Sequence, residues 1–459
     1  MAAAMEGFCR LAGDALDLSS PMKFLTWNDK HKLHHASLNV PERVATGFSG
    51  QGALALRELA RELRRANPTW ETAVTLHQVE AKLASVLRTI LEAAPETETG
   101  VAAAGVAQRL LDWTVDIGST RRHAVPIAFL PQRATRFAIG PVEFVHREDF
   151  GQADVKVGAS ASNANSATER HQFAMERIDK SLATRGAHWI ALVTVSNREA
   201  DVSVATANNA VDIALGALQA MVGTSGLNTI GRVGGRLANW DCFDTWFEMD
   251  GQTAFRRNDD PPGFAIDIGA FEKWLAEAHP ARSAAGQCLH AFLAGGPFPR
   301  LNEAWCEAAY WFHEAMAEHL DTMRIARLET SLEVLLRAEK SSGSANRILA
   351  GLEAVLGIDP STNIGVVRSV TMRELVEEMV RSRSRVLHGT WPTLTSDLPG
   401  TIPVSDLAAV VRRLIVMFAI KLEQYAANGD HKDDLAPFLT WVRGQATKRA
   451  STVVSAETK

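Results

Sequence analysis

The segment RSRVLHG places an arginine and a histidine, Arg383 and His388, at the end of a regularly patterned apolar stretch. The apolar positions are spaced by three, four and seven residues, which predicts an amphipathic helix over residues 372–387. They are Met372, Leu375, Val376, Met379, Val386 and Leu387. Arg383 comes four positions after Met379, where this pattern calls for an apolar side chain. Burying a guanidinium is costly unless it is paired or faces a polar cleft, so Arg383 is a candidate functional residue.

His388 lies at the C-terminal end of the predicted helix, with Gly389 as the expected cap. The helix dipole favours a protonated imidazole there, and a group that titrates near neutral pH suits proton transfer. A guanidinium can bind a phosphate through two parallel hydrogen bonds. Cleavage of RNA by its own 2′-hydroxyl needs one group that moves protons and another that stabilises charge on the phosphate. No metal-ligand spacing is visible nearby, so we expect neither a metal nor a cofactor.

The spacing of Arg383 and His388 raises a geometric difficulty. At ~100° per residue, positions five apart on an ideal helix point ~140° away from each other. Either the helix unwinds at His388 or a second helix completes the site. A two-fold dimer that brings two such helix ends together would form a shared cleft, so we expect a homodimer.

The same segment resembles the Arg-polar-x-x-x-His signature of HEPN domains, and especially the R-S-x-x-x-H-G form of the Apea-like branch. Upstream, residues 331–336 (SLEVLL) and 339–341 (EKS) resemble the LE-x-LL … EKS helix and loop of that branch. The resemblance covers residues 301–459, roughly a third of the chain.

The resemblance implies an all-α bundle that dimerises and acts as a metal-independent endoribonuclease on an RNA substrate. Arg383 and His388 would be catalytic, and the products would carry 2′,3′-cyclic phosphates. Ser384, Arg385 and Glu333 would have supporting roles; Glu333 matches a polar residue that often lies near the pair in this family. Such domains often serve as toxins or antiviral-defence effectors, so residues 1–300 would regulate the nuclease. The trigger would be a phage protein, a nucleic acid or a nucleotide.

Simpler interpretations exist for each of these residues. Arg383 can extend from the edge of the core and pair with Glu378 or another acidic residue. His388 can be a capping residue, and Glu333 can be an ordinary salt-bridging residue on an amphipathic helix. At the level of the protein, the alternatives are a non-catalytic HEPN module for dimerisation or RNA binding, and a ligand-binding regulatory protein that works through its middle region.

Arg383 and His388 must be positioned by the helices and strands that the rest of the sequence predicts. These predicted elements indicate a mixed α and α/β chain in three parts. Residues 1–115 read as mainly helical after an irregular start, 116–300 as a mixed α/β region, and 301–459 as an all-α bundle. In the last part we expect helices over 301–336 with one break, 345–356, 372–387, 405–427 and 433–447. In the middle we expect strands over 124–130, 137–145, 189–195, 243–249 and 264–268, a helix over 205–221, and a flexible loop over 158–168 (GASASNANSAT).

Composition narrows the class of protein. A net charge of −5 argues against a protein that coats nucleic acid through bulk electrostatics. It does not exclude an RNA site formed by a local cluster of arginines. Four scattered cysteines without CxxC spacing predict neither disulfides nor a zinc site. We expect a cytoplasmic protein without membrane contact.

His31, His34 and His35 lack partners at metal-ligand spacing, and the glycines at 231, 234 and 235 read as turns rather than a phosphate-binding loop. His313 and His319 are expected to face solvent or the bundle edge.

Overall fold

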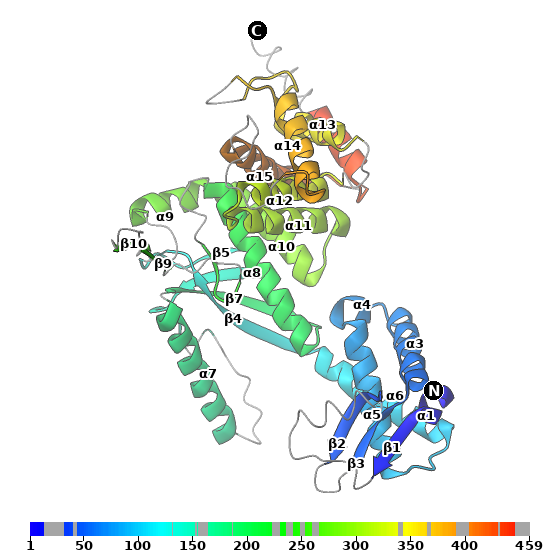
Figure 1. Ribbon diagram of the computed structural model, residues 1–459. Coiled ribbons are helices and arrows are strands. Elements are labelled where there is room, and N and C mark those ends of the chain that lie inside the picture. The colour runs from blue at the N-terminus through cyan, green and yellow to red at the C-terminus, as the bar shows by residue number, and fades with distance from the viewer. Residues whose placement is uncertain are drawn as a thin grey trace. The chain divides into compact units, whose positions relative to one another are not determined.

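Helices make up most of the structure, a computed structural model, and short antiparallel sheets lie in its N-terminal and middle regions (Figure 1). It describes residues 1–12, 32–39, 44–130, 132–151, 154, 164–185, 187–222, 230–235, 242–247, 253–258, 266–337, 343–364, 369–391, 404–429 and 432–445. The chain divides into two units. The first contains Met1–Arg121 and Ser196–Ala205, and the second contains Arg122–Val195 and Thr206–Lys459. Among the described residues, no helix is long and apolar enough to span a membrane.

The first unit packs helices on a small antiparallel sheet of order β1-β3-β2. The strands are β1 (Phe8–Ala12), β2 (His34–Asn39) and β3 (Val44–Phe48), and they lie in the stretch where the sequence predicted only an irregular start. The helices are α1 (Ala2–Glu6), α3 (Gly50–Ala66), α4 (Trp70–Ala73), α5 (Leu76–Ala93) and α6 (Thr99–Ile117). A capping box between Thr75 and Gln78 begins α5, and the apolar faces of α3, α5 and α6 form one core with Phe48.

The second unit contains a five-stranded sheet of order β5-β6-β7-β4-β8. Its strands are β4 (Thr120–Ala128), β5 (Phe137–Ile139), β6 (Val142–His146), β7 (Trp189–Ser196) and β8 (Gly231–Arg232). Successive side chains of a strand point to opposite faces. In β7, Trp189 and Ala191 therefore join the large core, whereas Ile190 joins a smaller cluster with Leu182 of α7 (Ala164–Arg185). Burial on both faces explains why the sequence of β7 is continuously apolar.

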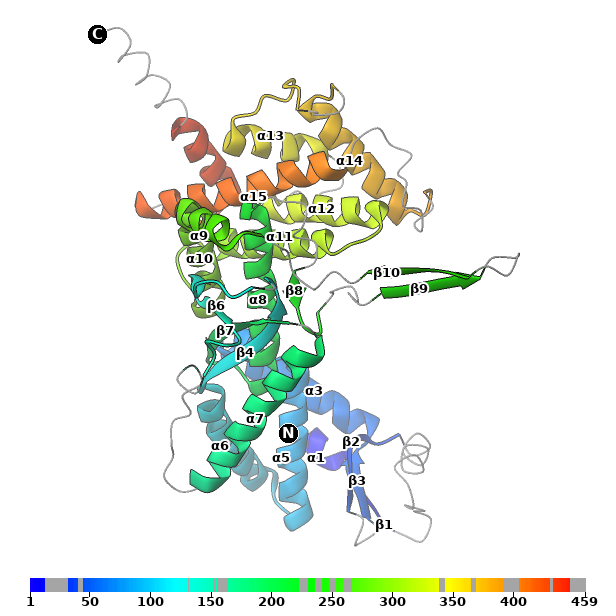
Figure 2. The same cartoon turned by 90° about the vertical axis from the view of Figure 1, so that its left-hand side faces the viewer.

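Several expectations for the middle region were wrong in detail. The single strand expected over 137–145 is a hairpin of β5 and β6, because Gly140 adopts φ +55° and turns the chain. Residues 164–168 of the expected loop begin α7, and residues 158–163 lie outside the described residues. The strand expected over 264–268 is also wrong where the structure describes it, since α9 begins at Ile268. Residues 243–247 of the strand expected over 243–249 do lie in a strand, β9 (Cys242–Phe247). It pairs with β10 (Thr253–Asn258), a strand that the sequence did not predict (Figure 2).

From residue 266 on, the described chain forms no strand. The helices are α9 (Ile268–Glu277), α10 (His279–Ala294), α11 (Pro299–Met316), α12 (Asp321–Leu335), α13 (Ser344–Leu356), α14 (Met372–Leu387), α15 (Val404–Ala427) and a helix over 435–445. Helix α12 packs against α11, α14 and α15 (Figures 1 and 2). The expected C-terminal helices are therefore present.

One hydrophobic core joins the sheet of the second unit to these helices. It contains Phe129 and Trp189 from the sheet region together with Trp305, Met379 and Phe418 from the helices. Helix α8 (Ala200–Val222) lies against α11, where Gly216 allows its backbone to approach that of Ala309. The expected boundaries near residues 115 and 300 stay predictions, but residues on both sides of 300 share this core.

Candidate active site

Helix α14 begins with a capping box in which the Thr371 hydroxyl accepts from the Glu374 backbone N–H, and the Glu374 carboxylate accepts from the Thr371 backbone N–H. Its predicted apolar stripe is buried from Met372 to Val386, but Leu387 is 57% exposed, contrary to the expectation. The reason is that Ser382, rather than Arg383, continues the row of side chains that faces the core. Ser382, only 2% exposed, takes the inward position between Met379 and Val386. Arg383 and Leu387, four apart, therefore lie on the edge of the stripe.

The Arg383 side chain turns towards α12 and meets two carboxylates. Its Nε lies 3.2 Å from Oε2 of Glu329, and its Nη2 donates to Oε2 of Glu333 at 3.4 Å. Ser344, the first residue of α13, donates its hydroxyl to the other oxygen of Glu333 at 3.2 Å. The expected partner Glu378 is wrong, since it pairs with Arg381. The broader expectation of an acidic neighbour is met by Glu333, a residue that the sequence singled out.

Glu329 is a residue that sequence reasoning missed. Its side chain is 1% exposed, against 18% for Glu333 and 34% for Arg383. Burial, reinforced by the nearby charge of Glu333 and opposed by Arg383, raises the pKa of Glu329 to about 8. A signal was present: Glu329 stands four residues after Ile325, which is also buried, and thus on the inward side of its helix.

His388 forms the C-cap of α14, and its backbone N–H donates to the Ser384 carbonyl at 3.0 Å. Gly389 has φ +67° and Thr390 donates its N–H to the Arg385 carbonyl, which is the glycine-type cap that the sequence predicted. The helix therefore stays regular up to His388. The His388 imidazole is exposed, and within the described part of the chain it has no hydrogen bond or ion pair.

Arg383 and His388 lie at the same helix end, but within one chain their side chains do not meet. Arg383 contacts α12, whereas His388 faces solvent. The structure thus keeps the angular separation that ideal helix geometry imposes, and it does not resolve it by unwinding. A complete Arg–His site requires a second copy of the helix end or a rearrangement on binding.

The remaining members of the segment are exposed. Ser384 is on the outer face, and the Arg385 guanidinium lies over the Trp391 ring at 5.0 Å from its centroid. Arg381 pairs with Glu378 on the same helix. Two of the three arginines at this helix end, Arg381 and Arg383, therefore have carboxylate partners, whereas the described partner of Arg385 is an uncharged ring.

The other sequence candidates lie elsewhere. His35 on β2 contacts Glu80 through Nε2 at 3.0 Å, His34 is on the same strand, and His31 lies outside the described residues. No group of three or more potential metal ligands gathers among the residues that the structure describes. Gly231 belongs to β8, whereas Gly234 and Gly235 form a turn.

His313 departs from its expected solvent-facing position. It is 7% exposed on α11, and its Nδ1 lies 2.8 Å from Oε1 of Gln219 on α8. Its Nε2 lies 4.0 Å from Asp212, which pairs with Arg232 of β8 at 3.1 Å. Burial lowers the pKa of His313, so the imidazole is neutral at physiological pH. This group joins α8, α11 and β8 inside the core.

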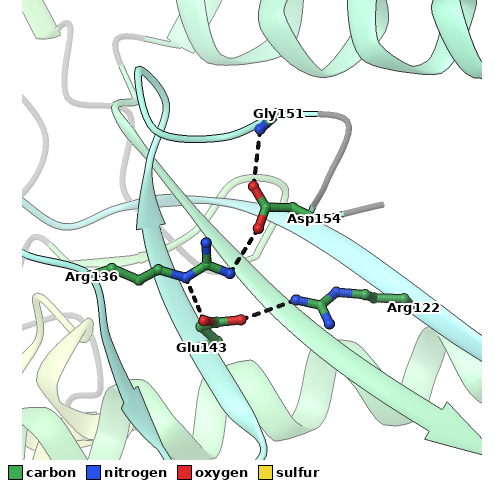
Figure 3. A network of polar contacts seen from close by, with 5 residues as sticks. All are labelled: Arg122, Arg136, Glu143, Gly151 and Asp154. Atoms are coloured by element: carbon green, nitrogen blue, oxygen red, sulfur yellow. Dashed lines mark hydrogen bonds and ion pairs between the residues drawn. The ribbon is translucent and has the colours of Figure 1, made fainter. Parts of the chain in front are cut away.

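A second charged network lies on the sheet (Figure 3). Glu143 of β6 pairs with Arg136 and, at 3.0 Å, with Arg122 of β4; Arg136 also reaches Asp154 at 2.8 Å. Asp154 in turn accepts from the Gly151 backbone N–H at 3.0 Å. The Arg136 hydrogen bond lowers the pKa of Glu143. All these charges have partners, which makes the network a structural clamp between β4 and β6 rather than a binding site.

Comparisons of the chain with protein-family models, with curated proteins and with solved structures found no match.

Proposed function

We propose that residues 301–459 act as a metal-independent endoribonuclease of the HEPN type, with Arg383 and His388 as the catalytic pair. The observation that carries this proposal is the end of α14. At the same helix end lie a partly exposed arginine, which two carboxylates hold, and an exposed histidine, which has no hydrogen-bond partner among the described residues. An unpartnered imidazole is free to move protons, and an arginine that is 34% exposed can still reach a phosphate.

In this reaction the RNA 2′-oxygen attacks the adjacent phosphorus. A bond forms between the 2′-oxygen and phosphorus, and the bond from phosphorus to the 5′-oxygen breaks. His388 takes the proton from the 2′-hydroxyl or gives one to the leaving 5′-oxygen. Arg383 stabilises the charge that develops on the phosphate. The products are a 2′,3′-cyclic phosphate and a 5′-hydroxyl.

The separation of Arg383 from His388 supports a shared site. In a two-fold dimer through the C-terminal helices, Arg383 of one chain would face His388 of the other. The first 300 residues would then regulate the nuclease, and a trigger, such as a phage product or a nucleotide, would raise its cleavage rate above a basal level.

A non-catalytic module for dimerisation or RNA binding is the second candidate. It is favoured by the ion pairs of Arg383, which already satisfy much of its charge. Chemical analysis of RNA ends separates the two functions. The chain is incubated with a 5′-labelled structured RNA in EDTA, and the fragments are treated with a phosphatase that spares cyclic phosphates. Fragments with cyclic-phosphate ends support the nuclease. Fragments with 3′-hydroxyl ends, or RNA left intact although it binds, contradict it.

A further inference from the structure

The Arg383 contact includes a carboxyl that is far more buried than its neighbour. Glu329 and Glu333 lie one helical turn apart on α12 and both reach the same guanidinium, but Glu329 is 1% exposed and Glu333 is 18% exposed. Transfer of an ionised carboxylate into such an environment is costly unless hydrogen bonds and a counter-charge compensate it. The two carboxyls therefore have different tendencies to carry charge.

The hydrogen bonds that would compensate an ionised Glu329 are incomplete. Its Oε2 and the Arg383 Nε lie 3.2 Å apart, but neither atom has a hydrogen-bond partner of good geometry in the described part of the chain. By contrast, Glu333 accepts from both Arg383 and Ser344. Glu333 is thus the settled anionic partner of Arg383, and Glu329 is an additional carboxyl whose charge is not needed to neutralise it.

The net charge around Arg383 depends on one proton. With Glu329 neutral, Arg383 and Glu333 balance, and a phosphate meets a guanidinium with one competing carboxylate. With Glu329 ionised, two carboxylates face one guanidinium and the cluster carries a net negative charge. Like charges at these distances interact strongly away from bulk water, so the second state disfavours an approaching phosphate.

We propose that Glu329 is a positioning residue whose protonation determines whether Arg383 is available to an RNA phosphate. The inference rests on the proposed function only in taking RNA as the source of the phosphate. Protonated Glu329 leaves Arg383 free to turn outwards from Glu333, and ionised Glu329 retains it against α12.

The surroundings of Glu329 restrict the groups that can set its charge. Within the described residues, the charged groups that act on it are Glu333 of its own helix and Arg383 of α14. From α13, Ser344 contacts Glu333 rather than Glu329. Helices α11 and α15 also pack on α12, but no charged group of theirs in the described chain acts on this carboxyl. The raised pKa of Glu329, about 8, places its ionisation just above neutral pH.

The first test is RNA binding as a function of pH. A fluorescent single-stranded RNA of about twelve nucleotides is titrated, at constant ionic strength, with the full chain carrying His388→Ala, which keeps the RNA intact. We expect the affinity to fall about tenfold between pH 7 and 9. Adding Glu329→Gln, which is neutral and nearly isosteric, removes this fall. The control Glu378→Gln, which alters the exposed pair with Arg381, keeps it.

The second test locates the ionisation of Glu329 without RNA. The free energy of unfolding is measured in urea for wild type and Glu329→Gln from pH 5 to 9. Because burial raises the pKa of Glu329 from 4.5 to about 8, the folded state holds a proton that the unfolded state has lost. Wild type should therefore lose stability relative to the variant as pH rises across that window.

The outcomes separate the inference from the nuclease proposal. A pH step that persists in Glu329→Gln, a difference in unfolding free energy that does not change with pH, or no RNA binding at any pH overturns the role of Glu329, even if the chain cleaves RNA. A fall in RNA affinity with pH that disappears in Glu329→Gln, in a chain that never cleaves RNA, supports the proposed role of Glu329 and overturns the nuclease proposal.

Discussion

Nε of Arg383 on α14 lies 3.2 Å from Oε2 of Glu329 on α12, so a motif residue that the sequence marks out is held by a carboxyl that it does not. The contact joins two neighbouring helices of the bundle at the point where the α14 stripe changes from apolar to polar. Because of this contact, the position of the Arg383 side chain depends on the charges of the two carboxyls on α12.

Removal of Arg383 should therefore destabilise the bundle. Near pH 7, Arg383→Ala leaves the Glu333 carboxylate without its counter-charge beside the largely protonated Glu329, and we expect a loss of about 1–2 kcal/mol in urea unfolding. The partial exposure of Arg383 keeps this loss below that of a fully buried pair. The matched control Arg381→Ala, at an exposed pair, should lose less than about 0.5 kcal/mol. In a Glu329→Gln background the cost of Arg383→Ala should be nearly unchanged at pH 7 and smaller than in wild type at pH 9, where Glu329 is ionised. Equal costs for Arg383→Ala and Arg381→Ala would show that the contact contributes little.

The close approach of α8 and α11 should be intolerant of a methyl group. A Cβ at Gly216 would lie 2.2 Å from the Ala309 carbonyl oxygen and 3.1 Å from the His313 Cβ, so the helices must move apart. We expect Gly216→Ala to lower the unfolding free energy by about 3 kcal/mol. The control is Gly444→Ala in the helix over 435–445, where no atom of the described chain lies within 4 Å of an added Cβ; its effect should be below about 1 kcal/mol in either direction. Similar unfolding midpoints for Gly216→Ala and Gly444→Ala would contradict the close approach of α8 and α11.

The buried imidazole of His313 should make the second unit sensitive to acid. Burial lowers its pKa from 6.5, so below that pH the unfolded chain binds a proton that the folded chain excludes. The stability present above pH 6.5 is lost as pH falls through the folded-state pKa. His313→Gln should be less stable at pH 7.5 but lose less stability between pH 7.5 and 5 than wild type. The variant His319→Gln, at an exposed position, should lose as much unfolding free energy as wild type between pH 7.5 and 5. An equal loss in His313→Gln would argue against the burial of His313.

If the site is shared between two chains, complementary inactive variants should rescue each other. Arg383→Ala and His388→Ala are mixed under conditions that exchange subunits, and cleavage of a labelled RNA is measured. A hetero-dimer has one site with both Arg383 and His388 and one with neither. We therefore expect up to about half of wild-type activity in hetero-dimers. A mixture as inactive as its components, although mass analysis shows exchange, would place both residues in a single chain.

The sequence predicted the parts of the fold that depend on local pattern. The spacing of apolar residues gave the bounds of α14 correctly and identified Arg383 as an irregularity, and the continuous apolar run of β7 marked a buried strand. It did not predict the β5–β6 hairpin, because the turn at Gly140 is short and flanked by strand-forming residues on both sides.

The candidate site was predicted less completely, because its partners come from another helix. Local pattern cannot say which residue of α12 faces Arg383, and Glu378, near in sequence, is instead taken up by Arg381. Glu333 entered through its resemblance to a family segment, whereas Glu329 required the packing of α12 on α14. His313 was misplaced for a similar reason: its partners Gln219 and Asp212 lie on α8, far away in the sequence.

The most direct test of the nuclease is cleavage of a labelled structured RNA in EDTA by wild type, Arg383→Ala, His388→Ala and the control Arg381→Ala. All four proteins are first shown to be folded by their unfolding midpoints. We predict that wild type and Arg381→Ala cut the RNA, and that Arg383→Ala and His388→Ala are at least a hundredfold slower, the order of magnitude expected for loss of a catalytic acid–base or charge-stabilising group. Cleavage at the wild-type rate by folded Arg383→Ala and His388→Ala proteins would contradict the assignment.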